Sequence, residues 1–164
     1  MRAAVITIST SVAAGRHGDD SGPLLRDLAR RLGAERVESE VVPDDRERIA
    51  QRLRHWADSE GCAIVLTSGG TGFAPSDQTP EATRAVLERD APGIPEAMRA
   101  ASRPHTDYWM LSRAAAGIRG HTLIVNFPGN PVSVGQTAEG LAPALTHALE
   151  LLAGRQPHAR PHRH

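Results

Sequence analysis

Four short runs rich in β-branched residues constrain the fold of this chain more than any other feature. They cover residues 3–8, 37–42, 63–67 and 122–126. The first, third and fourth runs are almost continuously apolar, as strands are when both of their faces are buried in a parallel sheet. Segments with helical periodicity separate the runs. This alternation predicts an α/β fold, a three-layer sandwich whose central sheet is mostly parallel.

The segments between the runs carry helix signals. Residues 20–32 place four leucines along one stripe, and Gly33 follows as a stop signal. We expect further helices over residues 44–58, 79–89, 96–101 and 139–152, and a separate helix start at Asn130–Pro131. Residues 107–113 fit either a strand or a helix, and residues 114–120 fit a strand or a loop.

The composition excludes several functional classes. The 19 basic residues balance 19 acidic ones, so the chain lacks the positive charge of a general nucleic-acid binder. No Lys is present, which excludes Schiff-base catalysis and a Walker-A phosphate loop. Cys62 is the single cysteine, so no intrachain disulfide can form, and we expect a reducing, cytoplasmic location. No apolar run approaches the roughly 20 residues of a membrane span.

The length of 164 residues suits one domain, which we expect to cover residues 1–154. Residues 155–164 are rich in His, Pro and Arg, and predict a disordered tail, with a weak metal-binding tract as the alternative. Trp56, Tyr108 and Trp109 are expected to pack in the core. For Tyr108 and Trp109, the border of a ligand site or of a subunit contact is the alternative.

A polar or glycine-rich segment follows every predicted strand. Ligands of an open parallel sheet bind beyond the carboxyl ends of its strands, so these segments should meet at one edge. The most informative segment follows the third run and reads Ser68, Gly69, Gly70, Thr71, Gly72. Glycines expose main-chain N–H groups and permit positive φ, so this loop can wrap an anion without a Lys. A tight structural turn is the alternative for the loop taken alone.

Two carboxylates stand beside the same edge. Asp77 follows the glycine loop, and Asp44 follows the second run. Each could simply support a helix N-terminus, where a negative charge is favoured. Each could also hold Mg²⁺, which prefers carboxylate and phosphate oxygens.

A second anion site is indicated after the fourth run. The turn Pro128–Gly129–Asn130–Pro131 delivers a helix N-terminus, and Ser133 adds a hydroxyl. The free N–H groups of a helix start bind anions. A plain β-to-α turn is the alternative.

Five ordered segments carry a family resemblance. The signature lies in residues 67–83, which include the glycine loop and Asp77. Residues 20–23 and 42–44 match earlier blocks, and residues 110–120 and 123–131 match later ones. Together they resemble the molybdenum-cofactor biosynthesis proteins of the Mog/MoaB type, a family that includes the gephyrin G domain. The resemblance extends over residues 3–153.

The resemblance implies a MoaB/Mog-like fold and molybdopterin adenylyltransferase activity, in which ATP and molybdopterin give adenylyl-molybdopterin and pyrophosphate, with Mg²⁺ as cofactor. It implies that Asp44 and Asp77 are the catalytic residues and the metal ligands. It assigns nucleotide and phosphate binding to Ser68, Gly69, Gly70, Thr71, Gly72, Asp20, Ser21 and Gly22. It assigns molybdopterin binding to Ser112, Pro128, Gly129, Asn130, Pro131 and Ser133. A homotrimer and a separate molybdenum-insertion partner are further implications.

Three residues in two segments depart from the family pattern. The family commonly has Arg where this chain has Ser76, and Asp-Arg where it has Thr10–Ser11. Arg16, Arg113 and Arg119 are candidates to replace the missing positive charge. A non-catalytic molybdopterin-binding paralogue or scaffold is therefore an alternative function. Another reaction on the same fold, such as that of the competence-damage type nucleotide hydrolases, is a third.

Overall fold

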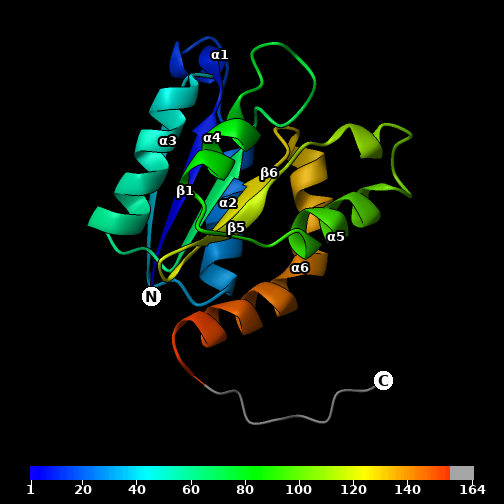
Figure 1. Ribbon diagram of the computed structural model, residues 1–164. Helices are drawn as coiled ribbons and strands as arrows, with labels where there is room; N and C mark the ends of the chain where they lie inside the picture. The colour runs from blue at the N-terminus through cyan, green and yellow to red at the C-terminus, as the bar shows by residue number, and fades with distance from the viewer. Residues whose placement is uncertain (156–164) are drawn as a thin grey trace.

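A six-stranded sheet forms the centre of the molecule in a computed structural model that describes residues 1–155 (Figure 1). The strand order is β2-β1-β3-β6-β5-β4. The four predicted runs form parallel strands: β1 (Arg2–Ile8), β2 (Arg36–Val42), β3 (Ile64–Ser68) and β6 (Thr122–Phe127). β5 (Ala116–Arg119) runs antiparallel to β6, and β4 (Arg89–Asp90) completes the sheet by pairing antiparallel with β5. The mostly parallel sheet is therefore confirmed.

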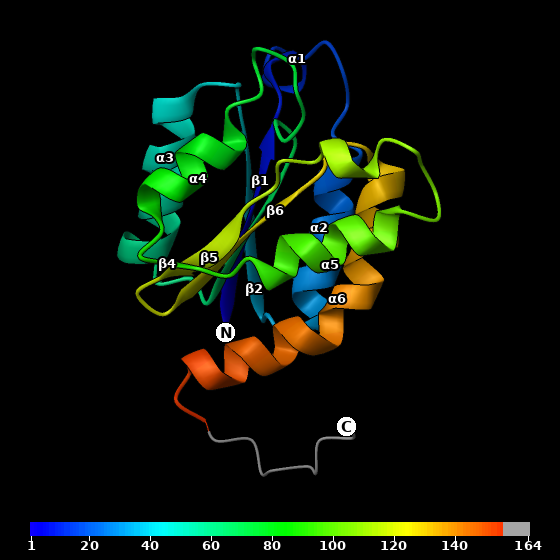
Figure 2. The same cartoon turned by 45° about the vertical axis from the view of Figure 1, so that its right-hand side comes forward.

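Helices cover both faces of the sheet and give three layers (Figure 2). On one face lie α2 (Ser21–Arg31), α5 (Gly93–Ser102) and α6 (Pro131–Leu152). On the other face lie α3 (Arg46–Arg54), continued by the π-helical turn η1 (His55–Ser59), and α4 (Thr79–Val86). Two short turns complete the set: α1 (Thr10–Ala13) after β1, and the 3₁₀ turn η2 (Trp109–Leu111).

The apolar runs are continuous because each strand contributes to two cores. Successive side chains of a strand point to opposite faces of the sheet. Ala3 and Val5 of β1 are buried with α2, α5 and α6, whereas Ala4 and Ile6 are buried with α3 and α4. Trp56 packs against the second of these cores, so its expected packing role is confirmed.

The C-terminal helix differs from the prediction. A helix start at Asn130–Pro131 and a separate helix over residues 139–152 were expected, but α6 is one helix of 22 residues. It contains Pro143 and bends along its length (Figures 1 and 2). Val134, Leu141 and Leu145 are buried in the core, and this packing offsets the poor helix propensity of the interior proline and glycines.

The segment between α5 and β5 is irregular. Residues 107–113, expected as a strand or a helix, contain only the turn η2. Residues 114–120, expected as a strand or a loop, include β5, which runs antiparallel to β6. No helix within residues 1–155 is long and apolar enough to cross a membrane. The tail expected over residues 155–164 lies, after its first residue, outside the described residues.

Candidate functional site

The carboxyl ends of the four parallel strands meet at one edge of the sheet, as the sequence predicted, and two adjoining pockets open there. The first has a volume of about 320 Å³ and is called the carboxylate pocket below. Its lining includes Asp19, Asp20, Ser21, Asp44, Ser68, Gly69, Gly70, Asp77, Gly129 and Pro131. The second has a volume of about 450 Å³ and is called the aromatic pocket. Gly70, Asp77 and Gly129 line both pockets.

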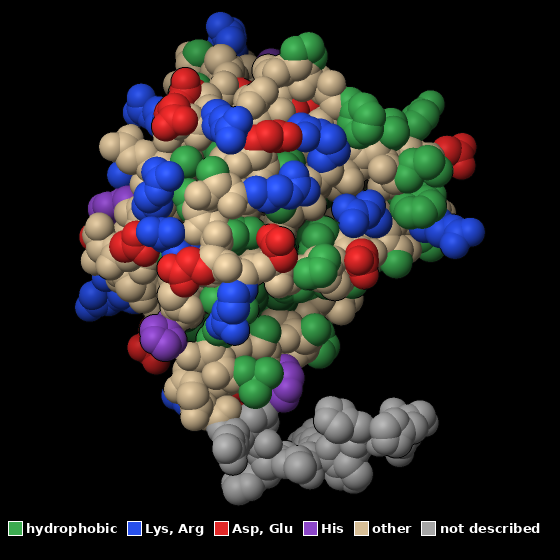
Figure 3. Space-filling model, in the orientation of Figure 1, with side chains coloured by type: hydrophobic (Ala, Val, Ile, Leu, Met, Phe, Trp, Pro, Cys, Tyr) green, Lys and Arg blue, Asp and Glu red, His purple; other side chains and the backbone are tan. Residues whose placement is uncertain are grey.

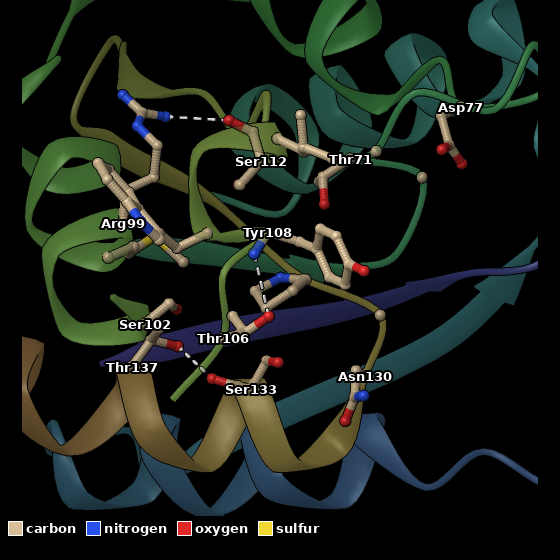
Figure 4. Close-up of a pocket in the computed structure, with 17 residues that line it drawn as sticks. Thr71, Asp77, Arg99, Ser102, Thr106, Tyr108, Ser112, Asn130, Ser133 and Thr137 are labelled. Carbon is tan, nitrogen blue, oxygen red and sulfur yellow. Dashed lines mark hydrogen bonds between the residues drawn. The ribbon is translucent and has the colours of Figure 1, made fainter. Parts of the chain in front are cut away.

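The aromatic pocket lies between the glycine loop, the segment 98–112 and the start of α6 (Figure 4). Of the residues assigned from the sequence, its lining includes Gly70, Thr71, Gly72, Asp77, Ser112, Pro128, Gly129, Asn130 and Ser133. Its other lining residues are Met98, Arg99, Ser102, Thr106, Tyr108, Trp109, Leu111 and Thr137. The structure therefore brings together most of the residues assigned to molybdopterin, with Pro131 placed in the carboxylate pocket instead.

Asp44 lies at the rim of the carboxylate pocket and is held there by Thr10. Its Oδ2 accepts hydrogen bonds from Thr10 N and Thr10 Oγ1, both at 3.0 Å. The cap of α3 is the next residue, Asp45, whose Oδ1 accepts from Arg48 N at 2.8 Å. The helix-capping alternative for Asp44 is therefore wrong, and its carboxylate lines the pocket instead.

Asp77 lines the carboxylate pocket together with Asp44, and it lies near a different glycine of the loop. Its Oδ2 accepts a hydrogen bond from Ala74 N at 3.0 Å. A Cβ added to Gly72 would stand 2.9 Å from Asp77 Oδ2, and one added to Gly70 would stand 3.2 Å from Asp44 Oδ1. The two carboxylates thus flank the loop that the sequence predicted to bind phosphate.

The glycine loop has a conformation that requires glycine. Gly69 and Gly70 have φ values of +97° and +66°. A Cβ on Gly69 would lie 2.3 Å from Ile8 O, and one on Gly70 would lie 2.3 Å from Thr79 Oγ1. Thr79 Oγ1 donates to Gly69 O at 2.9 Å, which ties the loop to the start of α4. The loop is therefore a rigid turn as well as part of the pocket wall.

Unpaired donors gather where the two pockets meet. Within residues 1–155 the N–H groups of Gly70, Thr71 and Gly72 have no protein acceptor, and the same holds for Gly129 and Asn130. Main-chain N–H groups arranged in this way bind anions. In the carboxylate pocket, the hydroxyl of Ser68 is buried without a hydrogen-bond partner among the described residues.

The start of α2 lines the carboxylate pocket with Asp20 and Ser21, two of the residues assigned to nucleotide binding from the sequence. Ser21 Oγ donates to Gly129 O at 2.6 Å, which joins α2 to the turn before α6. Asp20 lines the pocket, but Gly22 lines neither pocket and donates its N–H to Asp19 Oδ1 at 2.8 Å. Asp19, which was not singled out, also accepts from Thr7 Oγ1 at 2.8 Å. It adds a further carboxylate to the lining.

The three arginines considered as replacement cations line neither pocket. Arg113 donates Nε to Gly72 O at 2.8 Å and Nη2 to Asp77 O at 3.0 Å, and pairs through Nη1 with Glu81. Arg119 pairs with Asp58 at 2.7 Å, beside the opposite edge of the sheet, and Arg16 lines neither pocket. Within residues 1–155, Arg99 is the one basic side chain that lines either pocket.

Arg113 instead positions the loop that carries Asp77. Besides its side-chain bonds, its N–H donates to Thr71 O at 2.8 Å. The Arg113 guanidinium also lowers the pKa of Glu81 below its ordinary value, because it hydrogen-bonds the charged carboxylate.

Tyr108 does not pack in the core. The residue is 75% exposed, and it lines the aromatic pocket, so the packing expectation was wrong for it. Trp109 also lines the pocket, with the Arg103 guanidinium 5.7 Å from its ring centroid. For both aromatic residues the border of a ligand site was the alternative, and their place beside the pocket agrees with it.

Known proteins are similar to this chain in sequence and in fold. The family model described as "Probable molybdopterin binding domain" matches residues 4–147. The molybdopterin adenylyltransferase of Helicobacter pylori is 36% identical over 152 residues, which cover 92% of this chain and 86% of that protein. The Drosophila melanogaster molybdenum cofactor synthesis protein cinnamon is 42% identical over 149 residues, which cover 90% of this chain and 25% of that protein.

A solved structure agrees with these matches. The crystal structure of the molybdopterin biosynthesis enzyme MoaB from Thermus thermophilus superposes with a TM-score of 0.87 at 42% identity, covering 94% of this chain and 97% of that one. The MoaB/Mog-like fold and the resemblance found in the sequence are therefore confirmed. The chain belongs to the molybdopterin-binding domain family of molybdenum-cofactor biosynthesis, whose members include the molybdopterin adenylyltransferases.

Proposed function

We propose that this protein transfers the adenylyl group of ATP to the terminal phosphate of molybdopterin. The observation that carries the proposal is the junction of the two pockets at Gly70, Asp77 and Gly129. A nucleotide in the carboxylate pocket and molybdopterin in the aromatic pocket would bring their phosphates together there. Holding two reactants in this geometry supplies much of the rate enhancement of phosphoryl and nucleotidyl transfer.

The reaction forms one bond and breaks one. An oxygen of the molybdopterin phosphate attacks the α-phosphorus of ATP, the bond from that phosphorus to the β-phosphate bridging oxygen breaks, and pyrophosphate leaves with the electron pair. The free N–H groups of Gly70 and Gly129 would bind the phosphate oxygens and orient them for attack. No covalent bond to the protein is needed.

The carboxylate pocket fits a divalent cation. Among residues 1–155 its lining includes four Asp side chains and no basic one, so the pocket cannot neutralise a triphosphate by itself. Mg²⁺ binds one or two carboxylates together with substrate phosphates. Asp44 and Asp77 would hold it, and it would neutralise the charge that develops on the phosphates. No cluster of three or more His, Cys, Asp or Glu side chains suited to a metal occurs in the described part of the chain, so phosphate and water oxygens must complete the coordination.

The test is product formation by the purified protein with molybdopterin, ATP and Mg²⁺, followed by mass spectrometry. We expect adenylyl-molybdopterin and pyrophosphate, both dependent on Mg²⁺. Asp44→Asn and Asp77→Asn should each lower turnover by roughly a hundredfold or more, as when a group that stabilises transition-state charge is removed. Asp27→Asn is the matched control, because Asp27 is exposed on α2 and lines neither pocket.

Two outcomes would overturn parts of this proposal. Tight molybdopterin binding with no product from the unmodified protein would favour the non-catalytic binding paralogue. Full turnover in both Asp variants would show that Asp44 and Asp77 are not needed for the reaction.

We further propose a homotrimer in the cytoplasm that passes its product to a molybdenum-insertion protein. Measurement of the mass in solution tests the trimer.

A further inference from the structure

Three arginines line a pocket that lies outside the two pockets of the proposed reaction. This pocket, called the arginine hollow below, has a volume of about 250 Å³. Arg84 of α4, Arg99 of α5 and Arg113 line it. Because α4 and α5 cover opposite faces of the sheet, the hollow lies at the sheet edge formed by β5 and β4. Figure 3 shows several basic side chains close together on the face that carries α4 and α5.

The lining of the arginine hollow does not neutralise its own positive charge. Among the described residues, Asp90 is the one acidic side chain that lines it. The ion pairs found in the described part of the chain include none of Arg84, Arg99 and Asp90. Arg113 pairs with Glu81, which lies outside the lining. Guanidinium groups that share a small pocket repel each other, and an anion between them relieves that repulsion.

The three arginines also keep free hydrogen-bond donors. A guanidinium carries five N–H donors in a planar fork. Arg84 is absent from the arginines that donate side-chain hydrogen bonds within the described residues. Arg99 uses one donor, from Nη1 to Ser112 O at 3.3 Å. Arg113 makes one bond at each of its three nitrogens and so uses three of its five donors. Most of the donors therefore remain for a ligand.

The rest of the lining leaves a small space with fixed walls. Residues 114–116 are buried alanines at the start of β5, so no long side chain fills the space between the arginines. Pro92 and Pro95 also line the hollow, and a proline ring fixes its own φ. The volume of about 250 Å³ is below the roughly 300–1,000 Å³ of ordinary small-molecule sites. A ligand of only a few atoms suits this space better than a nucleotide does.

Arginine forks bind the oxygens of phosphate with pairs of charge-assisted hydrogen bonds. We propose that the arginine hollow binds a small, free oxyanion of the phosphate class. The arginines supply the positive charge, so this site requires no metal ion. Arg99 also lines the aromatic pocket, and Arg113 also holds Gly72 O, so two of the residues around the anion extend to the proposed reaction site.

The test is a titration of the full ¹⁵N-labelled protein with sodium phosphate at constant ionic strength, without ATP, molybdopterin or Mg²⁺. NMR spectra follow the Nε–H signals of the three lining arginines, which report on the hollow. The backbone N–H signals of Gly70 and Gly129 report separately on the junction of the other two pockets. We expect the three arginine signals to shift together and to saturate with one dissociation constant.

Arg84→Gln should weaken phosphate binding at the hollow about tenfold, because it removes a charged donor group from the anion. Arg84 is exposed and lines neither pocket of the proposed reaction, so the fold and the response of Gly70 and Gly129 should be unchanged. Arg84→Lys should weaken binding less, since it keeps the charge but not the planar fork. Arg89→Gln is the matched control, because Arg89 is exposed on the neighbouring β4 and does not line the hollow.

Four results would overturn the proposal. The first is the absence of a saturable shift of the arginine signals in the unmodified protein. The second is a shift confined to Gly70 and Gly129, which would place phosphate at the glycine loop alone. The third is an equal loss of affinity in Arg84→Gln and Arg89→Gln, which would show attraction to the general charge of this face. The fourth is tighter binding of methyl phosphate than of inorganic phosphate, which would exclude a free anion as the ligand. Because no substrate is present, these results are independent of whether the protein transfers an adenylyl group.

Discussion

Thr10 and Asp44 hold each other through a closed set of hydrogen bonds. Thr10 Oγ1 donates to Asp44 Oδ2 at 3.0 Å and accepts from Asp44 N at 3.1 Å, while Thr10 N donates to the same carboxylate oxygen at 3.0 Å. The contact joins the start of α1 to the loop after β2. Thr10 occupies a position where the family commonly has Asp. In this chain the neutral hydroxyl of Thr10 therefore orients the Asp44 carboxylate, whereas an Asp at position 10 would add a negative charge beside it.

Thr10→Val should lower turnover about tenfold, since it removes a hydrogen bond to a carboxylate worth roughly 1.5 kcal/mol. Thr10 is exposed, so the fold should be kept. Thr10→Ser retains the hydroxyl and is the matched control. Steady-state rates at several Mg²⁺ concentrations provide the measurement. Equal rates for the valine variant and the unmodified protein would show that Thr10 does not position Asp44.

Gly70→Ala should disrupt the junction of the two pockets. The new Cβ would lie 2.3 Å from Thr79 Oγ1, and the φ of +66° disfavours any residue with a side chain. We expect a loss of stability of about 1–3 kcal/mol together with loss of ATP binding. Gly120→Ala is the control, because Gly120 has a φ of +56° and open space around it. Thermal unfolding and nucleotide titration should separate the two variants; equal nucleotide binding by both would contradict the expectation.

Arg113→Ala should slow turnover more than it weakens substrate binding. The change removes the donors to Gly72 O and Asp77 O that hold the loop in place. We expect kcat to fall roughly tenfold to a hundredfold and added guanidinium to restore part of it. Arg119→Ala removes an ion pair with Asp58 near the opposite sheet edge and should leave kcat unchanged. A change in KM with kcat unchanged, or no recovery of kcat with added guanidinium, would count against a positioning role.

The Glu81–Arg113 pair should make the free energy of unfolding depend on pH. Arg113 lowers the pKa of Glu81 from its ordinary value of 4.5, so the unfolded chain binds a proton more readily than the folded one. The pair stabilises the fold above pH 4.5, and its contribution is lost as the pH falls from 4.5 through the lowered folded pKa. Denaturant unfolding of the unmodified protein and Glu81→Gln, between neutral and acidic pH, should show free energies that converge at low pH. A constant difference would contradict the linkage.

The location of the site followed from the strands, but the roles of individual residues did not. Parallel strands place their carboxyl ends at one edge, so Asp44, Asp77 and the glycine loop could be assigned to a single site from the order of the runs. The sequence offered Arg113 as a replacement cation and did not single out Arg99. Only the tertiary contacts show that Arg113 holds the loop while Arg99 lines the pocket.

The sequence by itself determined the parallel sheet, and it placed the segments after the strands, with Asp44 and Asp77, at one edge of that sheet. These features depend on local periodicity, on glycine conformations and on the order of motifs along the chain. Tertiary structure alone decided that Asp45 rather than Asp44 caps α3, that α6 is continuous across Pro143, and that Tyr108 faces a pocket. Each of these outcomes depends on packing between segments far apart in the chain. Such packing outweighs local propensity, because its free energy comes from partners that no single stretch of sequence contains.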